Sequence, residues 1–109
     1  VMSMRQHILT LAPQIDGIFG VNDSTAIAVM QVLQENGYRI PEDISVVGFG
    51  DGPIATIASP PLTTVEQKGY EMGREAVRLL IQRLENPSAM INNQTKIITP
   101  SLVRRKTTR

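Results

Sequence analysis

Two short apolar runs, each followed at once by small and polar residues, constrain the fold of this chain more than any other feature. The run at residues 17–21 leads into Asn-Asp-Ser at 22–24, and the run at 44–49 leads into Gly-Asp-Gly at 50–52. Runs of this length are typical of buried strands, and asparagine, aspartate and serine are residues that cap the start of a helix. Two strand–helix units in succession predict an α/β fold, with a Rossmann-like parallel sheet flanked by helices.

The helices expected around this sheet each have one apolar face. Periodicity predicts a helix that ends before Pro13, a second one that ends at Gly37, and a third and clearest one over residues 69–85. Strand composition is found at 62–65, and at 95–99 and 101–105 on either side of Pro100. The apolar faces consist of Met4, Ile8 and Leu11, of Ala26, Val29, Met30 and Leu33, and of Val77, Leu80, Ile81 and Leu84.

The composition excludes several classes of site. The 109 residues include no cysteine, so disulfides, thiolate metal sites and cysteine nucleophiles are excluded. His7 is the single histidine, which argues against histidine metal clusters and Ser-His triads. No acid and base stand at a meaningful spacing, so we expect no enzyme, no catalytic residue, no metal and no cofactor. The glycine-rich stretch 48–52 has the spacing G-x-G-x-G, which is not a dinucleotide fingerprint.

Positive charge is concentrated at the end of the chain. Residues 104–109 carry four of the eleven positive charges, which leaves seven positive against ten negative charges in residues 1–103. A mildly acidic body binds polyanions poorly, and we interpret the basic end as a solvated terminus rather than a nucleic-acid site. No apolar run is long enough to cross a membrane, and the first residues do not resemble a signal peptide.

Polar loops follow both predicted strands at the point where each strand ends. In open α/β sheets, ligands bind at the carboxyl ends of the strands. The segment 22–24 has a structural alternative as a helix cap, and Asp51 has one as a turn residue. Because two such loops are expected at one edge of the sheet, a shared ligand cleft and the purely structural roles are equally acceptable interpretations.

Five blocks, taken in order along the chain, resemble a known family. They lie at 16–26, 37–49, 60–67, 72–80 and 101–108, and the most specific combination is Pro-Pro-Leu-Thr-Thr-Val near the middle with Arg-Arg-Lys-Thr-Thr near the end. This series resembles the carboxyl-terminal half of the effector-binding region of LacI/GalR family transcriptional regulators. The resemblance implies a two-subdomain, periplasmic-binding-protein-like fold.

The resemblance also implies a division of the chain. Residues 1–66 would form part of the carboxyl-terminal subdomain, 67–94 would cross to the amino-terminal subdomain with the long helix, and 95–109 would return as strands with the basic tail. The family's DNA-binding headpiece and the first half of the region are expected outside this chain.

Ligand residues can be carried over from the family one position at a time. Asn22 matches an asparagine that binds a sugar hydroxyl, and Gln67 matches a residue that lines the cleft at the crossover. Gly50 stands where the family commonly has the first aspartate of Gly-Phe-Asp-Asp, so only the second acid, Asp51, is present. The aromatic residue that often follows Gln67 is missing, and Tyr70 stands next to its position.

These departures bear on the effector that the resemblance implies. A carboxylate at position 50 would hold vicinal hydroxyls but repel an acid group. Gly50 therefore favours a phosphorylated or acidic sugar, or a sugar placed differently from the family's neutral ones. The competing interpretation is that Asp51 replaces the missing group. The family pairing implies a homodimer through Ile27, Ile54, Ile57 and Ala58. Ile54 and Ile57 are expected in a short loop-like stretch, where exposed apolar residues suggest a partner surface.

The resemblance therefore predicts the effector-sensing and dimerisation region of a cytoplasmic bacterial repressor. A sugar or sugar derivative would act allosterically, operator DNA would be bound only through the helix-turn-helix headpiece, and no membrane would be involved. The alternative is a periplasmic sugar-binding protein of a transporter, which has the same fold.

Overall fold

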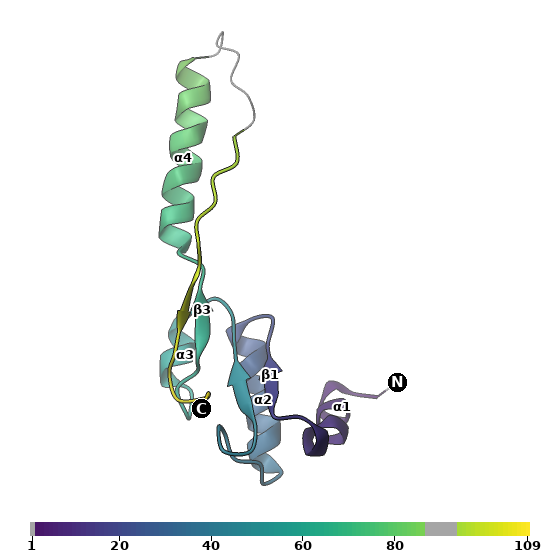
Figure 1. Ribbon diagram of the computed structural model, residues 1–109. Coiled ribbons are helices and arrows are strands. Elements are labelled where there is room, and N and C mark those ends of the chain that lie inside the picture. Colours follow the sequence, from purple (N-terminus) through teal and green to yellow (C-terminus); the bar gives the residue numbers. More distant parts are fainter. Residues whose placement is uncertain (1, 87–93) are drawn as a thin grey trace.

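The computed structural model describes residues 2–86 and 94–109. These residues form a packed body and a helix that projects from it (Figure 1). The chain is 63 Å long and 32 Å wide. Its elements are α1 (Met4–Leu11), a 3-10 turn (Ala12–Gln14), β1 (Gly17–Phe19), α2 (Asp23–Glu35), β2 (Ser45–Val47), α3 (Pro53–Ile57), β3 (Thr64–Glu66), α4 (Gly69–Glu85) and β4 (Ser101–Val103).

The strands confirm the predicted parallel arrangement. β1 and β2 are parallel neighbours, with Gly17 opposite Ser45 and Phe19 opposite Val47. A parallel bridge between Val47 and Thr63 continues this arrangement toward β3. β3 then pairs in antiparallel fashion with β4, which lies near the end of the chain.

The core of the body lies between α2 and β2, and it uses the predicted apolar face of α2. Asn36 caps the carboxyl end of this helix, and Gly37 follows with φ +86°, a left-handed conformation that glycine adopts without steric cost. The helix thus ends where the sequence predicted. The buried hydrophobic residues are Ala12, Ala26, Val29, Met30, Leu33, Ile40, Ile44, Val46, Ala55 and Leu62.

Three local predictions are wrong. Residues 95–99 contain no strand, and only Ser101–Val103 of the segment 101–105 is a strand, because β3 offers three partner residues and no more. The stretch around Ile54, which we expected to be loop-like, is the short helix α3, started by Pro53 at a position where a missing N–H costs nothing. The basic segment after β4 is not simply solvated, because part of it is buried in the body.

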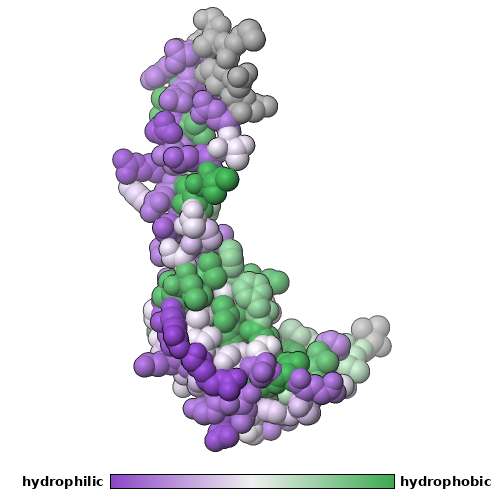
Figure 2. Space-filling model, in the orientation of Figure 1, coloured by the Kyte–Doolittle hydropathy of each residue, from purple (hydrophilic) through white to green (hydrophobic). Residues whose placement is uncertain are grey.

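Helix α4 has the predicted bounds but projects beyond the body (Figure 1). None of its residues is buried, and the apolar stripe formed by Val77, Leu80, Ile81 and Leu84 is exposed. On the face shown in Figure 2, hydrophilic side chains cover most of the projecting part, whereas hydrophobic ones gather over the upper part of the body. No helix within residues 2–86 and 94–109 is long and apolar enough to span a membrane.

Candidate functional site

The predicted ligand residues Asn22, Gly50 and Gln67 lie where three neighbouring segments of the sheet end, and we call this set the strand edge. Backbone hydrogen bonds bring the segments together, with the Gly20 N–H donating to the Val47 carbonyl at 2.8 Å and the Gly50 N–H to the Val65 carbonyl at 2.8 Å. A Cβ atom at Gly50 would lie 3.8 Å from Gln67 Nε2. The fold therefore assembles three of the five predicted ligand residues from separate loops.

Asn22 caps helix α2, which is the structural role that the sequence analysis gave as the alternative to ligand binding. Its Oδ1 accepts a hydrogen bond from the Thr25 N–H at 2.8 Å. Its side chain is nevertheless exposed, and its amide nitrogen makes no hydrogen bond to another described residue. The two roles are compatible, because the cap uses the oxygen and leaves the amide donor for a ligand.

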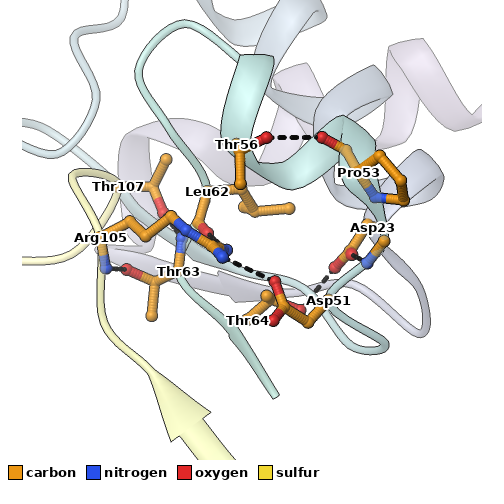
Figure 3. A network of polar contacts seen from close by, with 10 residues as sticks. Asp23, Asp51, Pro53, Thr56, Leu62, Thr63, Thr64, Arg105 and Thr107 are labelled. Atoms are coloured by element: carbon orange, nitrogen blue, oxygen red, sulfur yellow. Dashed lines mark hydrogen bonds and ion pairs between the residues drawn. The ribbon is translucent and has the colours of Figure 1, made fainter. Parts of the chain in front are cut away.

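Asp23 joins the loops of this region, a role that the sequence analysis missed. The residue is 5% exposed. Its Oδ1 accepts from the Thr64 hydroxyl at 2.5 Å and its Oδ2 from the Gly52 N–H at 2.9 Å (Figure 3). Its place in the first turn of α2 also stabilises the negative charge through the helix dipole. A sequence signal existed, since Asp23 is at helical spacing from Ala26 and Met30 and so falls on the buried face.

The observed arrangement of these loops requires glycine at positions 48 and 50. A Cβ at Gly48 would overlap Asp23 Oδ1 and approach Leu62 Cδ2 to 2.8 Å, so the carboxylate of Asp23 lies directly against the backbone of Gly48. Gly50 has φ +124°, a conformation that other residues rarely adopt. An aspartate at position 50 would therefore require a different loop conformation from the one observed.

The carboxylate of Asp51 is paired inside the protein. Its Oδ1 accepts from an Arg105 guanidinium nitrogen at 2.7 Å, and the two side chains are 19% and 18% exposed (Figure 3). Arg105 also donates to the Leu62 carbonyl at 2.9 Å. Asp51 stays a predicted ligand residue, but the structure shows a partner for it that the sequence analysis had not considered.

The segment after β4 is fixed by threonines as well as by Arg105. The buried Thr107 hydroxyl donates to the Val46 carbonyl at 2.6 Å and accepts from the Thr63 N–H at 2.9 Å. The Thr107 carbonyl accepts from the Val46 N–H at 2.9 Å. These bonds place the end of the described chain between β2 and β3, which is why the expectation of a solvated terminus fails.

The remaining predicted residues are more dispersed. Tyr70 is 85% exposed and lines a shallow depression on the first turns of α4 with Gly69, Gly73, Arg74 and Val77. Of the predicted dimer residues, Ile57 is 80% exposed and Ile54 is also exposed. Ile27 and Ala58 are partly buried and pack against the core of the body.

Two ion pairs on the surface shift the pKa of their acidic partner. Hydrogen bonds from the Arg39 side chain, followed by one from its backbone N–H, lower the pKa of Asp43. A hydrogen bond from Arg78 likewise lowers the pKa of Glu75. Within the described ranges 2–86 and 94–109, no cluster of three or more histidine or acidic side chains is arranged to hold a metal ion.

The fold is of periplasmic-binding-protein type. The family model of the periplasmic binding protein-like domain matches residues 2–108, and the chain belongs to this family. Nearly all of the chain is matched, so the α/β class and the two-subdomain type of fold predicted from the sequence are confirmed.

Relatives within this family are transcriptional regulators. The chain is 43% identical over 84 residues to the HTH-type transcriptional regulator CelR of Thermobifida fusca. The matched residues cover 77% of this chain and 24% of that protein. It is 37% identical over 101 residues to the ribose operon repressor of Haemophilus influenzae, covering 93% of this chain and 30% of that protein. The chain thus spans about a quarter to a third of the length of the curated relatives it matches.

Solved structures lead to the same group of proteins. A complex of the regulator CelR with cellobiose superposes with a TM-score of 0.85 at 34% identity, covering 94% of this chain and 31% of that one. A LacI family regulator from Arthrobacter sp. FB24 in complex with lactose gives a TM-score of 0.81 at 32% identity, covering 95% and 40%. The resemblance to LacI-type regulators predicted from the sequence blocks is confirmed, and these relatives are regulators rather than enzymes.

Proposed function

We propose that this chain is the carboxyl-terminal half of the effector-binding region of a bacterial transcriptional repressor. The observation that carries this proposal is the strand edge itself, in a chain 37% identical to a ribose operon repressor over 93% of its length. The amides of Asn22 and Gln67 suit the hydroxyls of a sugar or sugar derivative, since an amide both donates and accepts hydrogen bonds.

The division of the chain into subdomains is part of this proposal. Residues 1–66 belong to the carboxyl-terminal subdomain, 67–94 cross to the amino-terminal one, and 95–109 return; residues 87–93 of the crossing segment lie outside the described residues. Two observations support it. The apolar stripe of α4 is exposed, and among the described residues β1 pairs with β2 alone, leaving its other edge for a further strand.

The mechanism we propose is allosteric. β3 and β4 form the antiparallel pair through which the chain leaves the body and returns to it (Figure 1). An effector at the strand edge, which adjoins β3, would shift the orientation of the two subdomains about this pair. Such a ligand changes DNA affinity only if it binds the two orientations unequally.

Dimerisation is proposed for the surface that includes Ile27, Ile54, Ile57 and Ala58. Ile57 supports the proposal best, because it is 80% exposed and stands three residues from the exposed Ile54 on α3, so the two side chains can form one apolar patch for a partner. Changing Ile57 to Asp in the full-length protein should therefore produce monomers with an unchanged circular dichroism spectrum. Sedimentation analysis measures the result, and a variant that stays dimeric, or that unfolds, would contradict the assignment.

A DNA-binding experiment separates the proposed function from its alternative. A cytoplasmic repressor should bind operator DNA specifically as the full-length protein and change that affinity when a sugar is added. This chain alone should show at most weak, salt-sensitive binding, because its positive charges are few and Arg105 is paired. A periplasmic sugar-binding protein would bind sugar but not operator DNA. If the full-length protein binds a sugar but shifts no operator DNA in a gel-shift assay, the alternative function is the correct one.

A further inference from the structure

Three successive residues at the strand edge are each held by a different segment of the chain. The Gly50 N–H donates to a backbone carbonyl of β3 at 2.8 Å, and the Gly52 N–H donates to Asp23 Oδ2, at the start of α2, at 2.9 Å. Between them, Asp51 accepts a hydrogen bond from the Arg105 side chain at 2.7 Å, so this third contact comes from the segment after β4. The position of the 50–52 loop therefore depends on three segments that are distant in the sequence.

The backbone of Asp51 has a conformation that other contacts must support. Its φ is +54°, in the left-handed region, and Gly50 before it has φ +124°. A residue other than glycine stays in this region only where the surrounding structure compensates the energetic cost. Within residues 2–86 and 94–109, the Asp51 side chain has Arg105 as its one hydrogen-bonding partner. The Asp51–Arg105 pair is therefore the side-chain contact that holds this residue in place.

Arg105 is suited to this role because it is itself fixed. Its backbone N–H donates to the Thr63 hydroxyl at 2.9 Å, and its second guanidinium nitrogen donates to the Leu62 carbonyl at 2.9 Å. Figure 3 shows the Arg105 side chain beside these residues, with its end directed at Asp51. A planar guanidinium that is 18% exposed and bonded to two partners presents its charge to the carboxylate in one orientation.

The chain between the two members of this pair contains the whole segment that we propose to cross to the other subdomain. Asp51 and Arg105 are 54 residues apart, and β3, α4 and β4 lie between them in the sequence. Arg105 follows the end of β4 by two residues, so it belongs to the segment that returns to the body (Figure 1). A loop of the strand edge is thus tied to the returning segment by a charge pair that is largely buried.

We infer that Arg105 is a positioning residue of the effector site, and that Asp51 serves this site by holding the 50–52 loop rather than by binding the ligand. The inference rests on the proposed function, because it assigns roles within the same site. A ligand that took over the Asp51 carboxylate would remove the contact that supports the left-handed backbone at this residue. The effector is therefore bound by other groups of the strand edge, and the Asp51–Arg105 pair keeps the loop in place.

Hydrogen exchange in the full-length protein tests the holding role without any ligand. Arg105→Gln should speed the exchange of the amides in the 50–52 loop by about tenfold, because the loop opens more often once the pair is broken. The Val46 amide donates to the Thr107 carbonyl at 2.9 Å and so reports whether the returning segment stays bound; its exchange should match the wild type. Asp51→Asn breaks the same pair with a smaller change of shape and should give the same pattern.

The control for this experiment is Arg104→Gln. It removes an arginine charge from the neighbouring position, where the side chain is exposed, and should leave exchange in the loop unchanged. Unchanged loop exchange in Arg105→Gln would overturn the inference. Faster exchange at Val46 and in the loop alike would also overturn it, because Arg105 would then fix the whole returning segment and not the loop.

Calorimetric titration of the full-length protein tests whether Asp51 binds the ligand. The probes are D-ribose, cellobiose, lactose and sucrose. Any probe that binds the wild type should bind Arg105→Gln about tenfold more weakly and Arg104→Gln equally well. If the released Asp51 carboxylate served as a ligand residue, Arg105→Gln would bind the probe equally well or more tightly, and that result would overturn the inference. If no probe binds the wild type, the proposed function is contradicted, while the exchange experiment still decides the role of Arg105.

The double variant that combines Arg105→Gln with Asp51→Asn completes the test. If both residues act through one pair, the double variant should bind the probe no more weakly than either single variant. Losses of affinity that add up in the double variant would show that Asp51 contacts the ligand separately from Arg105. That result would overturn the role inferred for Asp51 and leave the proposed function in place.

Discussion

Helices α2 and α4 are both amphipathic, yet the body buries the apolar face of one and leaves that of the other exposed. On α2, Ala26 and Leu33 are fully buried against the sheet. On α4, the corresponding positions of the stripe, such as Leu80 and Leu84, are exposed although the pattern of apolar and charged residues is clearer there. An amphipathic pattern predicts a helix and its apolar face. It does not show whether the residues that pack on this face belong to the same segment of the chain.

The largest expected effect tests this contrast through cavities. In the 109-residue chain, Leu33→Ala should lower the free energy of unfolding by about 2–5 kcal/mol, because it removes a fully buried side chain. Leu80→Ala should change it by less than about 0.5 kcal/mol, because that side chain is exposed. In the full-length protein both changes should be costly if a second subdomain covers α4. Urea unfolding gives the free energy of unfolding for both variants in both chains. A large effect of Leu80→Ala in the 109-residue chain would contradict the contrast between α2 and α4.

Two glycines provide a test with opposite signs. Gly48→Ala should destabilise the body by about 1–3 kcal/mol, because the new Cβ would overlap Asp23 and Leu62. Gly73→Ala on α4 should stabilise the helix by about 0.5–1 kcal/mol, since nothing lies within 4 Å and alanine is the better helix former. Thermal unfolding followed by circular dichroism distinguishes them. A destabilising Gly73→Ala in this chain would reveal a contact on α4 that the structure lacks.

The smallest expected effect concerns acid pH. Arg39 lowers the pKa of Asp43 in the folded body, so this pair stabilises the protein above the unfolded-state value of about 3.9 and loses that contribution as the pH falls through the lower folded-state pKa. Asp43→Asn should therefore reduce the fall in stability on acidification, by a small amount because the pair is exposed. Urea midpoints at neutral and acid pH give the measurement.

The matched variant for this prediction lies on α4. Glu75 has its pKa lowered by Arg78 within the same helix. Because α4 does not pack on the body, Glu75→Gln should leave the unfolding midpoint of the body unchanged at both pH values. A midpoint that moves as much as it does for Asp43→Asn would show that the two parts unfold together.

Local patterns were sufficient for most of the elements and for the loops of the strand edge. The helix over 69–85, the capping role of Asn22 and the parallel arrangement of the first two strands all follow from residues near one another in the chain. The strand expected over 95–99 is absent because strand composition permits a ladder but does not supply a partner.

The sequence by itself determined the α/β class, the family resemblance and the placement of Asn22, Gly50 and Gln67 at one edge of the sheet. Only the tertiary structure showed that Asp23 is bonded to Thr64, 41 residues away, and that Asp51 is paired with Arg105, 54 residues away. Whether a carboxylate faces a ligand or an internal partner depends on such distant contacts. Hydrogen bonds and ion pairs act over a few ångströms in space, and the fold alone decides which residues come within that distance.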